Sequence, residues 1–299
     1  MEKEAGAGSC GMHQVKNLSS VICRNLQATQ SLSLCEKKYR KGTSVRGAKV
    51  CVSSTSCSSV PLAKDNSLVL EHVGPSLAHV LRRRGKPFTE EETRRVMRQL
   101  LGGAGRMHER RIVHRDIKPG NILLGLGQGR GDVVVKICDL GLAVSMNETP
   151  SRGQAGTLWY MAPEVLLGKP EYDELVDAWS LGCVMAELLA GEPLFRGQNA
   201  TDQLLGIFRV LGGAHGNPRL RELFPEERLS RDGFEILDGL LTCDPAKRLP
   251  ATVALQCPWF AGSGNTAATA VAVAVKLASP RQKDACTTIS SGADCRVAC

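Results

Sequence analysis

The residues whose types could carry chemistry gather in one stretch, 114–121 (HRDIKPGN), and in a triplet downstream, 139–141 (DLG). Together they contain two carboxylates, a lysine and an amide side chain. A positioned carboxylate can act as a general base, and carboxylate and amide oxygens can bind hard cations such as Mg²⁺. Either stretch alone is a weak signal, because loops use the same polar residues to form turns and caps.

A third stretch, 156–164 (GTLWYMAPE), follows the first two. Three motifs in this order and with this spacing are hard to obtain by chance. They resemble the catalytic loop, the metal-binding triplet and the end of the activation segment of eukaryotic protein kinases. The resemblance implies an ATP-dependent serine/threonine kinase that transfers the γ-phosphate to hydroxyl groups of a protein substrate.

The resemblance also implies a role for each polar residue. Phosphoryl transfer has a loose, charge-rich transition state, so a kinase mainly positions groups and neutralises charge. Asp116 would accept or orient the proton of the substrate hydroxyl, and Lys118 would contact the transferred phosphate. Asn121 and Asp139 would supply oxygens to Mg²⁺. The expected catalytic residues are therefore Asp116 and Lys118, the expected metal ligands are Asn121 and Asp139, and the cofactors are ATP and Mg²⁺.

The elements that must position these residues are mostly helical. Thr89 and Glu92 form a capping-box pattern ahead of an amphipathic helix. Residues 133–137 (VVVKI) predict a short buried strand, and 125–131 predict a glycine-rich hairpin tip rather than a phosphate loop. Further helices are expected over residues 177–189, 201–211 and 234–241. Together with the resemblance, this favours an α+β, protein-kinase-like fold with a mainly helical large lobe and a degenerate or incomplete β-rich small lobe.

Three further residues match the scaffold of the family. Asp177, in the stretch DAWSLG, resembles the buried helix aspartate that steadies the backbone of the catalytic loop. Glu164 and Arg248 match a Glu–Arg pair that locks the large lobe. These roles are structural, so these residues are not counted as catalytic.

Within the superfamily the resemblance is to cyclin-dependent kinases. Residues 156–164, 177–187 (DAWSLGCVMAE) and 202–212 (DQLLGIFRVLG) match that group, and 71–77 (EHVGPSL) are most similar to the F-class cyclin-dependent kinases of plants. The resemblance implies a protein substrate and suggests a cyclin-like regulator. The motif of the helix that reads a cyclin should lie before residue 64, and it is not found there.

Two departures from the family bear on activity and its control. The metal-binding triplet has Leu140 in place of the usual phenylalanine, and an apolar leucine can fill the same hydrophobic role. The activating threonine is expected about five residues before Thr157, where this chain has Arg152. A fixed positive charge cannot imitate a phosphate, which carries about −1.5 to −2 charges. We hypothesise that control by phosphorylation is absent here or relocated to Ser151 or Thr149.

Residues 68–73 (LVLEHV) resemble the hinge that joins the two kinase lobes. By that resemblance, the backbone groups of Glu71 and Val73 are expected to hydrogen-bond adenine. A glycine-rich loop, a strand lysine and a helix glutamate should precede the hinge.

None of those three features is recognisable. Residues 6–11 (GAGSCG) match GxGxxG, but only five residues precede them, which is too few for a leading strand. Lys16 lies too close to this match, and Lys49 leaves only 18 residues before Leu68, too few for a helix and two strands. The missing features keep a second function open, that of a catalytically impaired, pseudokinase-like binding module.

The chain is expected to contain three regions. Residues 1–63 would form a divergent, partly disordered segment in place of the kinase small lobe. Residues 64–261 would form the hinge and large lobe of the kinase domain. Residues 262–299 are rich in Ala, Ser and Thr and predict a disordered low-complexity tail.

The net charge of +8 belongs to the flanks. Residues 1–62 carry nine Lys/Arg and three Asp/Glu, 262–299 carry four and two, and 63–261 carry 25 of each. A basic flank is usually a solvated tail, so no nucleic-acid partner is expected. There is no run of about 18 apolar residues and no apolar signal core, so we expect no membrane association and a cytoplasmic or nuclear location.

Overall fold

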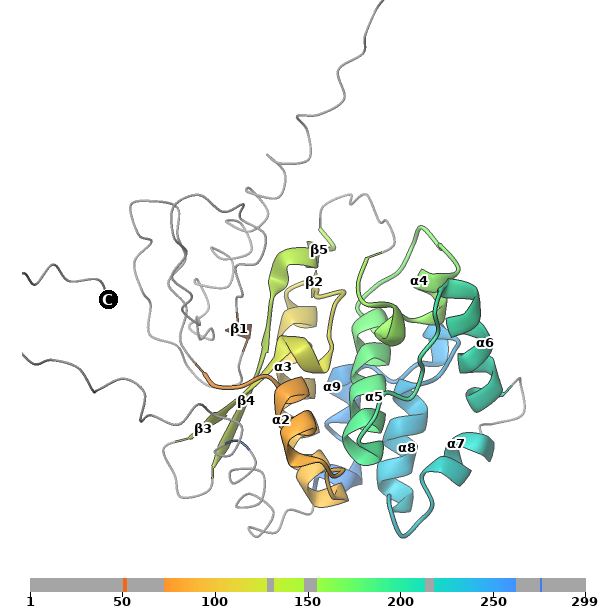
Figure 1. Ribbon diagram of the computed structural model, residues 1–299. Helices are drawn as coiled ribbons and strands as arrows, with labels where there is room; N and C mark the ends of the chain where they lie inside the picture. The colour runs from red at the N-terminus through yellow and green to blue at the C-terminus, as the bar shows by residue number, and fades with distance from the viewer. Residues whose placement is uncertain are drawn as a thin grey trace, which may run out of the picture.

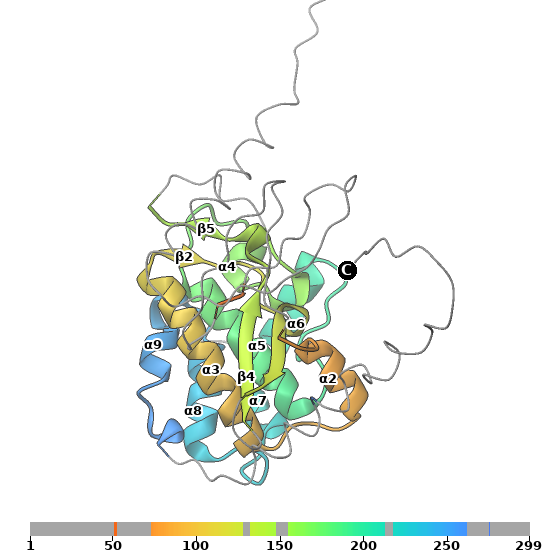
Figure 2. The same cartoon turned by 90° about the vertical axis from the view of Figure 1, so that its left-hand side faces the viewer.

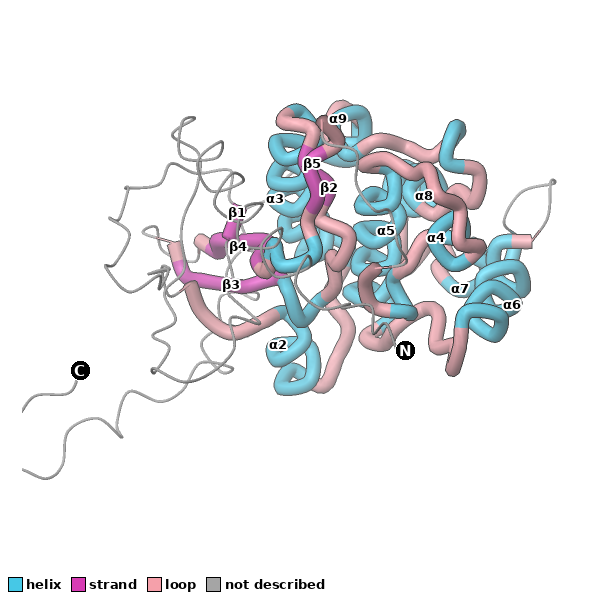
Figure 3. The backbone as a smooth tube through the Cα atoms, turned by 90° about the horizontal axis from the view of Figure 1, so that it is seen from above, coloured by secondary structure: helices cyan, strands magenta, loops and turns pink. Residues whose placement is uncertain are grey.

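The computed structural model describes residues 51–52, 73–127, 132–147, 155–212, 218–261 and 275. These parts form a helical body with the larger antiparallel sheet at one side and a two-stranded sheet at the upper end of α3 (Figures 1 and 3). Several predictions made from the sequence fall outside the described residues. They concern the glycine-rich match at 6–11, Lys16, Lys49, Glu71 and the three residues discussed as phosphorylation positions.

The first two helices of the body are α2 (Leu77–Arg84) and α3 (Glu90–Glu109). The predicted capping box at the start of α3 is confirmed. The hydroxyl of Thr89 accepts a hydrogen bond from the backbone N–H of Glu92 (3.2 Å), and the Glu92 carboxylate accepts one from the Thr89 N–H (2.7 Å). The predicted apolar face of α3 is buried in the core, at Val96, Met97, Leu100 and Leu101.

Helix α5 (Leu175–Ala190) is the central element, and every residue from Val176 through Leu189 is buried. A helix that is apolar on all sides needs neighbours on all sides. Helices α3 and α8 (Arg231–Leu240) pack against it (Figure 1). It ends at Gly191, whose φ of 84° is the left-handed conformation that glycine adopts without strain. The predicted helix over 177–189 is confirmed.

Other helices in the described residues are α4 (Pro163–Leu166), α6 (Ala200–Leu211), α7 (Pro218–Leu223) and α9 (Ala251–Ala254). Helix α6 packs against α4 and α7, and α9 packs against α3. The predicted helix over 201–211 is confirmed as α6. Helix α8 begins three residues earlier than predicted, because Ser230 caps its first turn by accepting a hydrogen bond from Gly233 N (3.3 Å).

The larger sheet has the strand order β1 (Cys51–Val52), β4 (Val133–Cys138), β3 (Ile122–Leu126), and both pairings are antiparallel (Figure 2). Leu126 pairs with Val133, so β3 and β4 form a hairpin. The predicted strand and the predicted hairpin are therefore confirmed. A second, two-stranded sheet joins β2 (Ile112–Val113) to β5 (Val144–Ser145).

The predicted Glu164–Arg248 pair is also confirmed. Arg248 donates from two guanidinium nitrogens to the two Glu164 carboxylate oxygens, at 2.6 and 2.9 Å, and both residues are buried. Arg248 also donates to the carbonyl of Leu175, the first residue of α5. The pair thus ties α4 to the central helix and to the loop that carries Arg248.

Within the part of the chain that the structure describes, no helix is long and apolar enough to cross a membrane.

Candidate active site

Three polar side chains surround Asp116, two from its own loop after β2 and one from a distant segment. Lys118 Nζ and Asn121 Nδ2 donate to Asp116 Oδ2, at 2.8 and 2.9 Å. Thr157 Oγ1 donates to the other carboxylate oxygen, Oδ1, at 2.7 Å. Lys118 Nζ also donates to Thr157 Oγ1 at 2.6 Å. The structure therefore brings together three of the residues expected from the sequence and adds Thr157.

Sequence reasoning placed Thr157 in a motif but gave it no role at the site. The 3₁₀ turn η3 (Leu158–Tyr160) begins directly after it. The preceding residue, Gly156, has a φ of 119°, and a Cβ built there would lie 2.5 Å from the carbonyl oxygen of Arg115. Only glycine allows this close approach, which brings Thr157 within reach of Asp116.

His114 connects the Asp116 loop to the end of β4. Its Nδ1 accepts from the Asp116 backbone N–H (3.2 Å), and its Nε2 lies 3.2 Å from the Cys138 carbonyl oxygen. Burial lowers the pKa of His114 below its ordinary value, in spite of the nearby carboxylates of Asp177, Asp116 and Asp139. A neutral ring that carries its proton on Nε2 satisfies both contacts. The residue after Cys138 is Asp139, so His114 couples the two expected catalytic segments.

Asp139 has φ 76° and ψ 67°, a left-handed conformation that is uncommon outside glycine and costs on the order of 1–3 kcal/mol. It precedes the short turn η2 (Leu140–Leu142). A Cβ at Gly141 would lie 3.2 Å from Asp139 Oδ1, so the glycine leaves room for the carboxylate. Backbone strain of this kind is typical of functional positions.

The side-chain oxygens of Asn121 and Asp139 are of the kind that Mg²⁺ binds. Asn121 Nδ2 donates to both the carbonyl and the carboxylate of Asp116, which turns the amide oxygen of Asn121 away from Asp116. One amide oxygen and one carboxylate are the hard oxygen ligands that Mg²⁺ takes, with phosphate and water completing its shell.

Asp177, at the start of α5, holds the backbone of the catalytic loop, as the sequence predicted. Its carboxylate accepts from the N–H groups of His114 (2.8 Å) and Arg115 (2.9 Å) and contacts His108 Nε2 (3.0 Å). Burial alone would raise the pKa of Asp177. The hydrogen bond and charge of His108, together with the His114 contact, outweigh burial and lower it below the ordinary value.

Asp177→Asn is expected to destabilise the protein near neutral pH and to do so less in acid. The amide turns a donor toward groups that already donate, and each unsatisfied buried donor costs about 1–3 kcal/mol. The wild-type carboxylate has a lowered pKa. Its stabilisation is therefore complete above the unfolded-state pKa of about 3.9 and is lost as the pH falls through the lower folded-state pKa. Urea unfolding of both proteins between about pH 7 and about pH 3 measures this difference. A stability gap that stays constant into acid would contradict the assignment.

Val73, an expected adenine-binding residue, lies beside the strand that follows Asn121. Leu124 N donates to the Pro75 carbonyl (2.9 Å), and Ser76 bridges to Leu123. Gly74 has a φ of 152°, and a Cβ there would lie 2.2 Å from the Leu124 carbonyl oxygen, so the segment runs directly along β3. The structure therefore places Val73 next to the strand that leads out of the catalytic loop.

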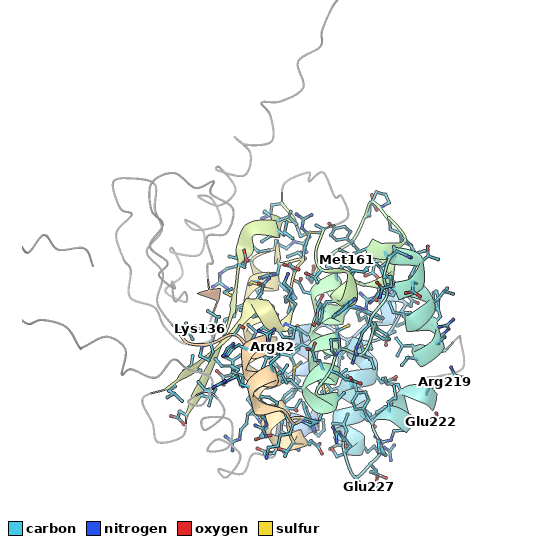
Figure 4. All side chains as sticks on the ribbon, in the orientation of Figure 1. Arg82, Lys136, Met161, Arg219, Glu222 and Glu227 are labelled. Atoms are coloured by element: carbon cyan, nitrogen blue, oxygen red, sulfur yellow. The ribbon has the colours of Figure 1, made fainter. Side chains whose placement is uncertain are left out.

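Asp116 also lines a small pocket, with room for about one water molecule. Its lining combines apolar side chains (Met161, Val165, Val176) with polar ones (Arg115, Thr157, Tyr172, Ser180). Met161 lies between β5 and α4 in the view of Figure 4. The Asp116 side chain keeps 12% of its surface exposed and is therefore not sealed in the core.

Comparisons with known proteins give the following matches. A family model described as the protein kinase domain matches residues 44–260. A rice protein (Oryza sativa subsp. japonica) that carries the name cyclin-dependent kinase F-2 is 47% identical over 220 residues, which are 64% of this chain and 65% of that protein. Cell division control protein 2 homolog 3 of Trypanosoma brucei brucei is 39% identical over 216 residues, 64% of this chain and 68% of that protein.

A third curated relative is much longer than this chain. Rice cyclin-dependent kinase G-2 (Oryza sativa subsp. indica) is 40% identical over 221 residues, but the match covers only 30% of its length. The solved structures include a chain of the yeast RNA polymerase II CTD kinase CTDK-1 complex, with a TM-score of 0.59 and 28% identity, covering 68% of this chain and 74% of that one. The family match begins at residue 44, inside the segment predicted to replace the small lobe. The three predicted region boundaries stay a prediction.

Proposed function

This chain belongs to the protein kinase family, and we propose that it is an ATP-dependent serine/threonine protein kinase of the cyclin-dependent-kinase-like group. One observation carries the proposal. The Asp116 carboxylate is held by Lys118, Asn121 and Thr157 at a single point, and His114 links this loop to the strand end that precedes Asp139. The cluster joins the proposed base to one proposed cation ligand, Asn121, and the proposal adds Asp139 as the second ligand, as phosphoryl transfer requires.

In this proposal Asp116 is the catalytic base. Its carboxylate accepts or orients the proton of the substrate hydroxyl, and the donors on both of its oxygens fix its direction. Lys118 supplies a positive charge next to that oxygen, where charge spreads over the transferred phosphoryl group. Thr157 positions both side chains from the substrate side, because its hydroxyl donates to one and accepts from the other.

Asn121 and Asp139 would hold Mg²⁺, and the backbone of Val73, with Glu71, would hold the adenine of ATP. When bound, the metal and nucleotide supply a phosphoryl group whose negative charge is partly neutralised. The chain's own residues orient the acceptor hydroxyl and stabilise the developing charge.

Partners and location follow from the same proposal. The substrate is a protein with an exposed Ser or Thr hydroxyl. A cyclin-like protein is the regulator to test first, because the curated relatives are named as cyclin-dependent kinases. We propose a cytoplasmic or nuclear location for the protein.

A second candidate function is that of a binding module that holds a substrate or regulator without turnover. It is favoured by one observation, namely that a glycine-rich loop and a strand lysine are not recognisable before the hinge in the sequence. Such a module would keep the pocket beside Asp116 but would not transfer phosphate.

One assay separates the two functions. The purified full chain is incubated with labelled ATP, Mg²⁺ and a generic basic protein substrate, with chelation of the metal and Asp139→Asn as controls. The kinase proposal expects label on Ser or Thr that disappears in both controls. Equal labelling by wild type and Asp139→Asn, or no labelling by either even with a cyclin-like protein added, rejects the kinase proposal. Substrate binding that persists without any labelling supports the binding module.

A further inference from the structure

Arg115 occupies the point where the segments of the site meet. Its backbone N–H donates to Asp177 (2.9 Å), and its carbonyl lies against Gly156. Its guanidinium Nε donates to the carbonyl of Leu142 (2.7 Å), and Nη1 donates to the hydroxyl of Tyr172 (3.0 Å). One residue of the catalytic loop thus contacts the segment after Asp139, the segment before Thr157 and the loop between α4 and α5.

The acceptors of the Arg115 guanidinium are neutral. Among the described residues, no carboxylate lies within ion-pair distance of Arg115, although several other arginines of this domain are paired with Glu. A guanidinium is always charged and binds anions well, but its hydrogen-bond partners here are a backbone carbonyl and a phenol hydroxyl. The backbone of Arg115 is held at φ 67°, in the left-handed region, and the two side-chain hydrogen bonds hold its guanidinium.

The side chain of Tyr172 is held in place by burial and by its hydrogen bond to Arg115. It is only 8% exposed and belongs to the apolar core, with its hydroxyl reaching Arg115. Its ring also lines the pocket beside Asp116, together with Val176. Because burial already restricts the Tyr172 ring, its hydroxyl stays at a fixed place, and the hydrogen bond to Arg115 costs little further side-chain entropy.

We propose that Tyr172 is a positioning residue, and that its hydroxyl, through Arg115, holds the segments carrying Asp139 and Thr157 on the catalytic loop without a phosphate group. This inference rests on the proposed kinase function only for its effect on turnover. The contact itself links two neutral acceptors to one cation, so it needs no phosphate as a partner. We call the Tyr172–Arg115–Leu142 contact the clamp. A clamp that uses no phosphate agrees with the sequence, which has Arg152 where an activating threonine was expected.

The clamp can be tested without any activity. Hydrogen exchange is followed on peptides covering residues 139–146 and 155–161 in the wild-type full chain, Tyr172→Phe, Arg115→Ala and the double variant. Tyr172→Phe removes one hydroxyl and keeps the ring, so the core packing is preserved. We expect faster exchange in both peptides for each single variant and no further acceleration in the double variant, because both substitutions break the same contact. Arg231→Ala, which removes an exposed arginine on α8, is the matched control and should change neither peptide.

Turnover gives the second readout. We expect Tyr172→Phe to lower kcat about tenfold, the scale of one hydrogen bond to a charged group. KM for ATP should stay unchanged, because Tyr172 is not in the segment that contains Val73. Arg115→Lys keeps the charge but cannot bridge both acceptors, so it should not restore the rate. Phosphatase treatment of the wild type should leave both the exchange and the rate unaltered.

Each outcome has a distinct meaning. Unchanged exchange in Tyr172→Phe, or additive effects in the double variant, overturns the clamp whether or not the protein is active. Faster exchange after phosphatase treatment overturns its independence from phosphate. Faster exchange in Tyr172→Phe with no phosphate transfer by the wild type supports the clamp and rejects the proposed kinase function.

Discussion

Asp116→Asn is expected to lower the rate of phosphate transfer by about 10²–10⁴-fold, the range that a positioned general base contributes. The carboxylate is the one group at the site that can accept the substrate proton while three donors hold it in place. An amide is nearly the same size, so the loop should keep its fold, but it cannot accept the proton.

The substitution also changes the hydrogen bonds at the site. One Asp116 oxygen accepts from both Lys118 and Asn121, and the other accepts from Thr157. An amide nitrogen on the first side would face two donors, whereas one on the second side would face the Thr157 hydroxyl, which can turn to accept it. We therefore expect the second orientation and a loss that falls mainly on kcat.

The comparison needs a control for the chemical change itself. Asp232→Asn makes the same replacement at an exposed position in the first turn of α8. Initial rates with Mg-ATP and a basic protein substrate should be unchanged for Asp232→Asn and reduced for Asp116→Asn. Unfolding temperatures measured for all three proteins establish that the loss is not one of folding. A rate within about threefold of wild type for Asp116→Asn is inconsistent with a base at this position.

Glu164→Ala is expected to reduce the free energy of unfolding by about 3–5 kcal/mol, because it leaves a buried arginine without its counter-charge. Arg248 is 2% exposed, so it cannot reach water without moving the surrounding chain. Its remaining partners are backbone carbonyls, of Thr242 (2.8 Å), Leu175 (2.9 Å) and Cys243 (3.3 Å). These dipoles do not neutralise the charge.

Because Arg248 packs on the core, the destabilisation caused by Glu164→Ala should extend to the core. Its guanidinium lies over the ring of Trp179, 5.2 Å from the ring centre, and Trp179 is fully buried in α5. A shift of the arginine toward solvent would therefore disturb the packing of the central helix, so we expect the loss to appear as global destabilisation.

An exposed ion pair provides the contrast. Glu235→Ala removes the partner of Arg231 on the outer surface of α8, where both side chains are well exposed. Surface pairs of this kind contribute little, so its urea midpoint should stay close to that of the wild type. Equal shifts of the midpoint for Glu164→Ala and Glu235→Ala would show that burial does not set the strength of the Glu164–Arg248 pair.

Local structure and family membership were determined by the sequence itself. The capping box at Thr89, the strand over 133–137 and the buried helix over 177–189 depend on neighbours a few residues apart, so their patterns are visible in the chain. The motif residues Asp116, Lys118 and Asn121 also lie within six positions of one another. For that reason the sequence already grouped three of the four residues of the Asp116 cluster, whose roles stay a prediction.

The long-range contacts of the site were decided only by the tertiary structure. Thr157 meets Asp116 across 41 positions, His114 meets Cys138 across 24, and Arg115 meets Tyr172 across 57. Whether such pairs touch depends on where α3, α5 and the β3–β4 hairpin place their loops, and no local pattern encodes that distance. Single hydrogen bonds add too little free energy to fold the chain, so these contacts form because packing of the core has already brought their partners together.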